Sequence, residues 1–247
     1  MIPSAPMPRR RTPRPWRALL RAAARRLLYV ALALAATSVA AVAVYRFVPV
    51  PATPLMLLRL VGQMRDERRV VRLEKDWVGG DDISSHLRLA VVCAEDQRFP
   101  EHHGFDFAAI RKAIRHNQQS SRLRGGSTIS QQTAKNVFLW DGRTWLRKGL
   151  EAWFTIWIEL LWSKQRILTV YLNVVEFGDG IYGAEAAAQR FFRKPAKDLS
   201  RDEAALLAAV LPNPRLYSVA SPGPQAQRRQ RWILEQMRRW PGDSFEF

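Results

Sequence analysis

The sequence predicts a mainly α-helical protein with a single transmembrane helix near its N-terminus. Residues 27–45 form a run of nineteen residues without a charge, and a helix of roughly 20 apolar residues is needed to span the hydrocarbon core of a bilayer. After residue 80, apolar residues recur at helical spacing between Gly/Pro turns, with little strand-type alternation. We therefore expect a helical body over residues 81–247, behind a membrane anchor over residues 27–48.

The segments on either side of the anchor are basic or rich in proline. Residues 1–26 contain eight arginines, five prolines and no acidic residue, a composition typical of a disordered tail. Because these arginines precede the apolar run, the positive-inside rule places the tail in the cytoplasm and the body outside the inner membrane. The alternative is a cleaved signal peptide, but the run exceeds a usual signal core and residues 46–54 lack a clear small-x-small cleavage site. We expect a juxtamembrane connector over residues 49–80.

Composition limits the classes of partner. The chain has 247 residues, 47% of them hydrophobic, which is enough to form one hydrophobic core. Its formal net charge of +17 suits an anionic partner. No nucleic-acid motif or zinc spacing occurs, so nucleic acid is not the expected partner. Cys93 is the only cysteine, which excludes an internal disulfide.

Capping residues predict where the helices of the body begin. Ser84 or Ser85, Asp106 and Thr144 each precede an apolar stripe at helical spacing. Capping-box patterns stand at Thr128-Ile-Ser-Gln131 and Ser200-Arg-Asp-Glu203. Further helices are expected over residues 164–174 and, after a glycine turn at 176–183, in an alanine-rich stretch that ends at residue 192.

Glu95 is the first candidate catalytic residue. It lies four residues after Val91 and eight after Leu87, so it continues the apolar stripe of its helix. Desolvation there raises the pKa of a carboxyl group, which suits a general base near neutral pH. The alternative is a helix-end glutamate that reaches solvent.

The segment from Gly125 to Lys135 is a candidate anion site. A helix that starts after two glycines presents free N–H groups to an anion, and Lys135 lies one to two turns further along. Simple capping is the alternative for Ser127, Thr128 and Gln131, and both uses are compatible. Arg147 and Glu151 are four residues apart and, taken alone, would be expected to pair on the surface.

Five segments together resemble the motifs of the peptidoglycan glycosyltransferases (family 51), in the same order, over about residues 81–220. They read Glu95-Asp96-x-x-Phe99-x-x-His102-x-Gly104-x-Asp106; Gly125-Gly126-Ser127-Thr128-Ile129-Ser130-Gln131-Gln132 with Lys135-Asn136; Arg147-Lys148-x-x-Glu151; Ile167-Leu168-x-x-Tyr171-Leu172-Asn173 with Gly178, Gly180, Gly183 and Ala186-Ala187; and Glu203-Ala204-Ala205-Leu206-Leu207 with Leu211-Pro212-Asn213-Pro214. One departure is Thr169, where relatives commonly have glutamate.

The resemblance implies a lysozyme-like glycosyltransferase domain with a small membrane-apposed subdomain. The implied reaction polymerises lipid II into linear β-1,4 glycan strands of peptidoglycan with inversion and release of polyprenyl diphosphate. Only about 30 residues follow the fifth motif, so the chain resembles the monofunctional form, without transpeptidase activity.

The resemblance also assigns roles to residues. It makes Glu95 the base and Glu151 a second glutamate that orients cations or helps to hold a divalent metal, while Lys135, Arg143 and Lys148 are candidates to hold the diphosphate. Other expected substrate-binding residues are Asp96, Phe99, His102, Gly125, Gly126, Ser127, Thr128, Gln131, Gln132, Asn136 and Arg147. We expect no cofactor and no metal site of the protein itself; a divalent cation such as Mg would arrive with the substrate diphosphate.

The implied partners are lipid II, the nascent glycan strand and the bilayer, with cell-wall synthesis and division proteins as further candidates. Tryptophan favours membrane interfaces, and five tryptophans lie between residues 137 and 162; of these we expect Trp153 and Trp157 in the core.

Two alternative functions stay open. A membrane-anchored lytic glycosidase of lysozyme type would not need the Gly-Gly-Ser-Thr segment with its cations, and an inactive cell-division scaffold would be expected to lose Glu95 or Glu151.

Overall fold

The computed structural model describes residues 15–66, 70–119, 125–142 and 144–241. The chain divides into two compact units, residues 1–41 and residues 42–247. The elements in chain order are α1 (Pro15–Tyr45), α2 (Pro54–Met64), β1 (Glu74–Lys75), the 3-10 helix η1 (Gly80–Asp82), α3 (Ser85–Glu95), α4 (Phe107–Gln119), α5 (Ile129–Phe138), α6 (Trp145–Leu161), α7 (Lys164–Val174), β2 (Glu176–Gly178), β3 (Ile181–Tyr182), α8 (Ala184–Phe192), the 3-10 helix η2 (Ala196–Asp198), α9 (Arg201–Val210) and α10 (Pro224–Arg239). The predicted mainly α fold with one long apolar N-terminal helix is confirmed.

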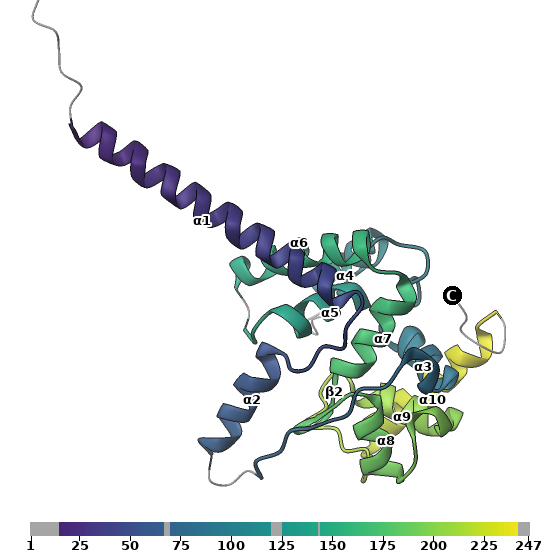
Figure 1. The fold of residues 1–247 in the computed structure, drawn as a ribbon. Helices are drawn as coiled ribbons and strands as arrows, with labels where there is room; N and C mark the ends of the chain where they lie inside the picture. Colours follow the sequence, from purple (N-terminus) through teal and green to yellow (C-terminus); the bar gives the residue numbers. More distant parts are fainter. Residues whose placement is uncertain (1–14, 67–69, 120–124, 143, 242–247) are drawn as a thin grey trace, which may run out of the picture. The chain divides into compact units, whose positions relative to one another are not determined.

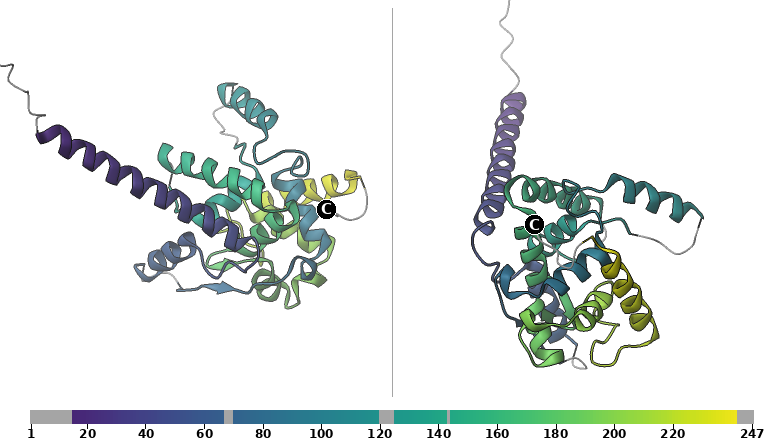
Figure 2. Two further views of the ribbon diagram at one scale, coloured as in Figure 1. Left: turned by 45° about the horizontal axis from the view of Figure 1, so that its top comes forward. Right: turned by 90° about the vertical axis from the view of Figure 1, so that its right-hand side faces the viewer.

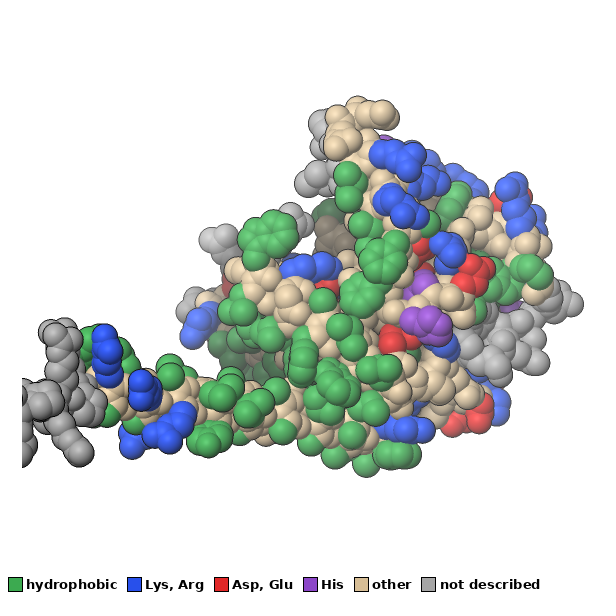
Figure 3. Space-filling view, turned by 90° about the horizontal axis from the view of Figure 1, so that it is seen from above, with side chains coloured by type: hydrophobic (Ala, Val, Ile, Leu, Met, Phe, Trp, Pro, Cys, Tyr) green, Lys and Arg blue, Asp and Glu red, His purple; other side chains and the backbone are tan. Residues whose placement is uncertain are grey.

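The first unit consists of most of α1, which is long and apolar enough to cross a membrane. The expectation of an irregular tail is wrong for residues 15–26, which already belong to this helix; residues 1–14 lie outside the described part of the chain. Proline is well tolerated in the first helical turn, and the alanines, leucines and arginines that follow are strong helix formers. Arginines gather on the first turns of the helix, and apolar side chains follow them (Figure 3).

The centre of the second unit is α7, which Figure 1 shows between the other helices of the body. Every residue from Ile167 to Val174 is buried, as expected for a helix that is covered on all sides. On one side α7 packs against α5, which also contacts α6. A second layer is formed by α9 with α3 and α10. By contrast, α4 projects from the side of this body (Figure 2).

The predicted helix starts are confirmed by cap hydrogen bonds. The Ser84 hydroxyl accepts from the backbone N–H of His86 at the start of α3. Thr128 and Ser200 form complete capping boxes at the starts of α5 and α9, and Thr144 caps α6. Each cap satisfies a backbone donor that has no partner within its own helix.

The expected glycine turn at residues 176–183 is a β-hairpin in the structure. Strand β3 pairs antiparallel with β2 and parallel with β1, so the strand order is β1-β3-β2. Gly180 has φ +74°, and a Cβ there would lie 2.3 Å from the backbone oxygen of Arg72. Only glycine fits this approach without strain. Strands of two or three residues are too short to show alternation in the sequence.

The connector contains a helix that sequence analysis did not predict. The Thr53 hydroxyl accepts from the N–H of Met56 and caps α2, and Pro54 occupies its first position. Sequence analysis predicts only a connector over residues 49–80, whereas a proline directly after a threonine cap is typical of a helix start. The Gln63 amide at the far end of α2 donates to Asp179 Oδ1 at 3.3 Å, and its oxygen accepts from the N–H of Arg72 at 2.9 Å. These bonds tie α2 to the hairpin.

The tryptophans of residues 137–162 divide between the core and the surface. Trp162 is buried, and its indole N–H donates to the Val42 backbone oxygen at 2.8 Å. Trp157 is half-buried against the core, as expected. Trp153 packs edge-on against Trp157 but remains 36% exposed, so the prediction of a core position is wrong for it. Trp145, at the start of α6, is 93% exposed.

Candidate active site

Glu95 ends α3 as a partly desolvated carboxylate with two hydrogen-bond donors. Its side chain is 15% exposed. Arg229 Nη2, from α10, donates to Oε1 at 2.9 Å, and Gln132 Nε2, from α5, donates to Oε2 at 3.0 Å. Burial raises the pKa of Glu95, while the Gln132 hydrogen bond and the Arg229 charge oppose that rise. The desolvation expected from the apolar stripe is confirmed, and it keeps a basic carboxylate beside donors that fix its orientation.

Tyr171 sets the orientation of the Gln132 amide. The Tyr171 hydroxyl, from the buried helix α7, donates to Gln132 Oε1 at 3.2 Å, which leaves the amide N–H₂ to face Glu95. Burial and the nearby Glu95 charge raise the pKa of Tyr171 well above its usual value, so its hydroxyl stays protonated as a donor. The expected substrate-binding residue Gln132 is thus also a link between the core and the candidate base.

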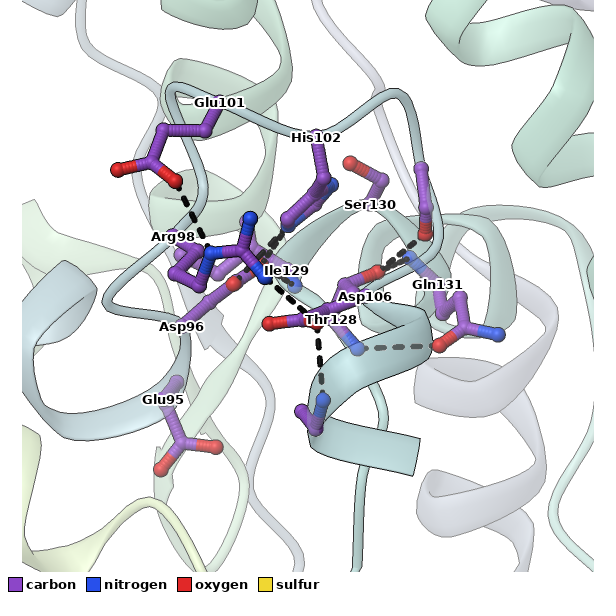
Figure 4. A network of polar contacts seen from close by, with 12 residues as sticks. Glu95, Asp96, Arg98, Glu101, His102, Asp106, Thr128, Ile129, Ser130 and Gln131 are labelled. Carbon is purple, nitrogen blue, oxygen red and sulfur yellow. Dashed lines mark hydrogen bonds and ion pairs between the residues drawn. The ribbon is translucent and has the colours of Figure 1, made fainter. Parts of the chain in front are cut away.

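Asp96 is directed away from Glu95, although the two residues are adjacent (Figure 4). His102 Nε2 lies 2.9 and 3.0 Å from the two Asp96 carboxylate oxygens, and the N–H of Ile129 donates to Oδ2 at 2.9 Å. Asp96 and His102 are both buried. Phe99, also predicted to bind substrate, is fully buried in the core. In the structure the Asp96 carboxylate joins the end of α3 to the start of α5.

The Gly-Gly-Ser-Thr segment borders a cavity. Besides capping α5, the Thr128 hydroxyl donates to the Gly104 backbone oxygen at 2.7 Å, and the buried Gln131 side chain accepts from the Thr128 N–H at 3.0 Å. The expected capping is therefore confirmed for Thr128 and Gln131. The cavity measures about 400 Å³. Its lining includes Glu95, Asp96, Lys112, Gly125, Gly126, Ser127, Thr128 and Trp232.

A buried glutamate on α6 organises the cations of the site. Glu151 accepts from Arg147 Nη1 at 2.9 Å and from Lys148 Nζ. Both carboxylate oxygens are thus paired inside the protein, unlike the surface pair expected from the spacing. Burial lowers the pKa of Lys135, and the Glu151 charge opposes that effect. Lys135 is therefore a desolvated cation near Glu151, whereas Lys148 is half-exposed; Arg143 lies outside the described residues.

A second cavity, of about 210 Å³, is lined in part by Gln132. Its lining includes Lys135 and the buried Asn136, together with Arg59, Glu176 and Arg215. Gln132 lines this cavity and Glu95 lines the first, so their hydrogen bond links one wall residue of each. Within the described residues, no group of three or more His, Cys, Asp or Glu side chains is placed to hold a metal ion.

Sequence analysis missed Arg229. This residue lies in α10, outside the five motifs, and 134 positions after its partner Glu95. The sequence offers no local signal for such a pair, because α10 carries several arginines of which one turns inward.

The transglycosylase family model matches residues 62–238 of this chain. A biosynthetic peptidoglycan transglycosylase of Escherichia coli is 56% identical over 205 residues, which cover 83% of this chain and 85% of the relative. The protein of the same name from Cronobacter sakazakii is 56% identical over 209 residues, 84% of this chain and 86% of the relative. One from Salmonella enteritidis is 55% identical over 222 residues, 90% of this chain and 92% of the relative.

Proposed function

Because this chain belongs to the transglycosylase family, we propose that it polymerises lipid II into linear β-1,4 glycan strands and releases polyprenyl diphosphate. The helical body carries the lysozyme-like fold of that family. The observation that supports the proposal most is Glu95: a desolvated, doubly hydrogen-bonded carboxylate on a cavity wall, near enough to Lys135 of α5 for the two charges to interact.

The proposed step is an inverting displacement at the anomeric carbon of the donor. Glu95 accepts the proton of the acceptor 4-hydroxyl as O4 forms its bond to C1, and the bond between C1 and the diphosphate oxygen breaks. An inverting reaction needs its base on the face opposite the leaving group. The electron pair of the broken bond stays with the diphosphate as it departs.

The cations near Glu151 would stabilise the leaving diphosphate. Fixed cations in a site with little water stabilise developing negative charge strongly. Lys135 is desolvated and Lys148 is half-exposed, and both are close to the buried Glu151 carboxylate. In this proposal Glu151 holds Arg147 and Lys148 in place, and Arg143 joins them. A divalent cation bound to the diphosphate would come with the substrate.

The membrane part of the proposal follows from the substrate. A polyprenyl tail stays in the bilayer, so the enzyme that uses it must work at the membrane surface. The apolar helix α1 fits a single-pass anchor, and the preceding arginines favour a cytoplasmic N-terminus with the body in the periplasm, at the inner membrane. The exposed Trp145 and Leu146 of α6 would then face the lipid interface. Association with cell-wall synthesis and division proteins would follow from this location.

One assay separates the proposed function from its alternatives. Purified full-length protein is incubated in detergent with labelled lipid II, and the products are separated on a gel before and after lysozyme treatment. Polymer that lysozyme digests supports the proposal. Release of fragments from purified peptidoglycan without polymer formation would instead indicate a lytic glycosidase, and the absence of both activities would indicate a scaffold.

A further inference from the structure

The helix α10 places an arginine on its buried face, directly against the candidate base. The inward-facing residues of α10 include the buried Ala226, Ile233 and Met237. Arg229 falls on the same stripe, three residues after Ala226 and four before Ile233. Its Nη2 donates both to Glu95 Oε1 at 2.9 Å and to the Ala94 backbone oxygen at 3.2 Å. An arginine at a packed position has lost part of its hydration, so water screens its charge-assisted hydrogen bond with a carboxylate less than it would on the surface.

We propose that Arg229 is a positioning residue for the base: its guanidinium group fixes the Glu95 carboxylate in the ionised form before the acceptor hydroxyl arrives. This inference rests on the proposed function, in which Glu95 removes the proton from the acceptor. It assigns a role in the reaction to α10, a helix outside the five motifs. The same helix places Trp232 on the wall of the cavity that Glu95 lines.

Among the charged and titratable groups around Glu95, Arg229 is the cation that contacts its carboxylate. On α3 itself, the Asp96 carboxylate faces away and is held by His102. From α7, Tyr171 is a neutral hydroxyl that reaches Gln132 rather than the carboxylate. Neither group supplies a positive charge to Glu95.

On α5, the donor to Glu95 is also neutral. Gln132 gives a hydrogen bond without a charge. Lys135 acts on Glu95 only through space, more weakly than Arg229, and it interacts more strongly with Glu151. Arg229 therefore provides the main positive charge that opposes the cost of burying the Glu95 carboxylate.

The expected pH dependence follows from these opposing effects. Burial raises the pKa of Glu95, and the Arg229 charge lowers it. Removal of the positive charge should raise that pKa further, so the Glu95 carboxyl group should stay protonated up to a higher pH. At a pH below the pKa, a rise of one pKa unit reduces the ionised fraction of the carboxyl group about tenfold. The activity lost at neutral pH should return as the pH increases.

The test compares Arg229→Gln and Arg229→Lys with the control Arg228→Gln, whose side chain is exposed on the same helix. Initial rates of lipid II polymerisation are measured from pH 5.5 to 9.5. We expect the acidic limb of the Arg229→Gln profile to move up by about one pH unit, with a roughly tenfold loss near neutral pH and recovery at high pH. Arg229→Lys should restore much of the wild-type profile, and Arg228→Gln all of it.

A second readout does not depend on activity. Carboxyl ¹³C NMR of glutamate-labelled protein, with the Glu95 resonance assigned by its loss in Glu95→Gln, should show a higher Glu95 pKa in Arg229→Gln than in the wild type. An unchanged pKa together with an unchanged pH profile would overturn the inference. So would an equal rate loss at every pH, which would indicate substrate binding or packing.

Failure of the inference is distinguishable from failure of the proposed function. If the wild type forms no polymer, the function is wrong, whatever the variants do. If Arg229→Gln does not fold, Arg229→Met, which has a side chain of similar reach, replaces it. If neither neutral variant folds while Arg229→Lys does, Arg229 serves the fold and the inference is rejected.

Discussion

The carboxylates of Glu95 and Asp96 are adjacent in the chain but point in different directions and have different partners. Helix α3 ends at Glu95, and Asp96 has left the helical conformation at φ −160° and ψ 75°. This change directs the Asp96 carboxylate to His102, while Arg229 and Gln132 hold the Glu95 carboxylate, although both residues line the same cavity. The two acids should therefore respond to mutation in different ways.

Asp96→Asn should reduce stability. The change removes the charge that His102 and the N–H of Ile129 contact in a buried site, and loss of a buried polar partner costs roughly 1–3 kcal/mol. Denaturant unfolding measures the effect, with the exposed Asp81→Asn as the control. Equal unfolding free energies in the two variants would show that the Asp96 pair has no structural role.

Gly180→Ala should destabilise the hairpin. The new Cβ would meet the Arg72 backbone oxygen at 2.3 Å, and φ is +74°; backbone strain of this kind costs about 1–3 kcal/mol. The matched control is Gly62→Ala in α2, where no atom beyond the adjacent residues and the backbone of the helix itself lies within 4 Å of the added Cβ. That control should gain up to about 1 kcal/mol, because alanine is the better helix former. The account of the hairpin is wrong if thermal unfolding ranks the two variants in the opposite order.

Lys148→Ala should lose activity with little loss of stability. Its side chain is 45% exposed, and the buried Glu151 keeps Arg147 as a partner after the change, so the loss of stability should be small. A contact with the leaving group in the transition state is worth about 2.7–4 kcal/mol, or roughly a hundredfold to a thousandfold in rate. Polymerisation rates and melting temperatures are compared with those of Arg228→Ala. Rates that match this control would place the diphosphate elsewhere.

The same comparison extends to Lys135 and Arg143, the other two proposed diphosphate contacts. Lys135 is mostly desolvated, so Lys135→Ala should change the melting temperature more than Lys148→Ala does. Its rate loss should still exceed what the stability change explains.

The orientation of the anchor has its own test. A reporter that requires the periplasm should be active when fused after Phe247, and one that requires the cytoplasm should be inactive, because the arginines precede the apolar helix. Activity of a reporter that requires the cytoplasm would reverse the proposed orientation. N-terminal sequencing that finds a chain starting after residue 40 would show cleavage instead of anchoring.

Local signals in the sequence predicted much of the helical body. Ser84, Thr128 and Ser200 were predictable as helix caps because each hydroxyl accepts a hydrogen bond from a backbone N–H only two or three residues further along the chain. Spacing alone also placed Glu95 on the buried stripe of its helix.

Long-range contacts could not be predicted in this way. The Arg229 contact joins segments 134 residues apart, and strand β1 pairs with a hairpin more than 100 residues later. The pairing of Glu151 was expected, but its burial depends on how α5 and α6 pack. These features arise from tertiary packing, which sequence periodicity does not encode.

The most direct test of the central claim is the polymerisation rate of Glu95→Gln with labelled lipid II, beside the wild type. Glutamine keeps the shape of the side chain but cannot accept the proton of the acceptor hydroxyl. We predict a variant that folds and still binds lipid II but forms no polymer that lysozyme can digest. Substantial polymer formation by folded Glu95→Gln would contradict the role of Glu95 as the base.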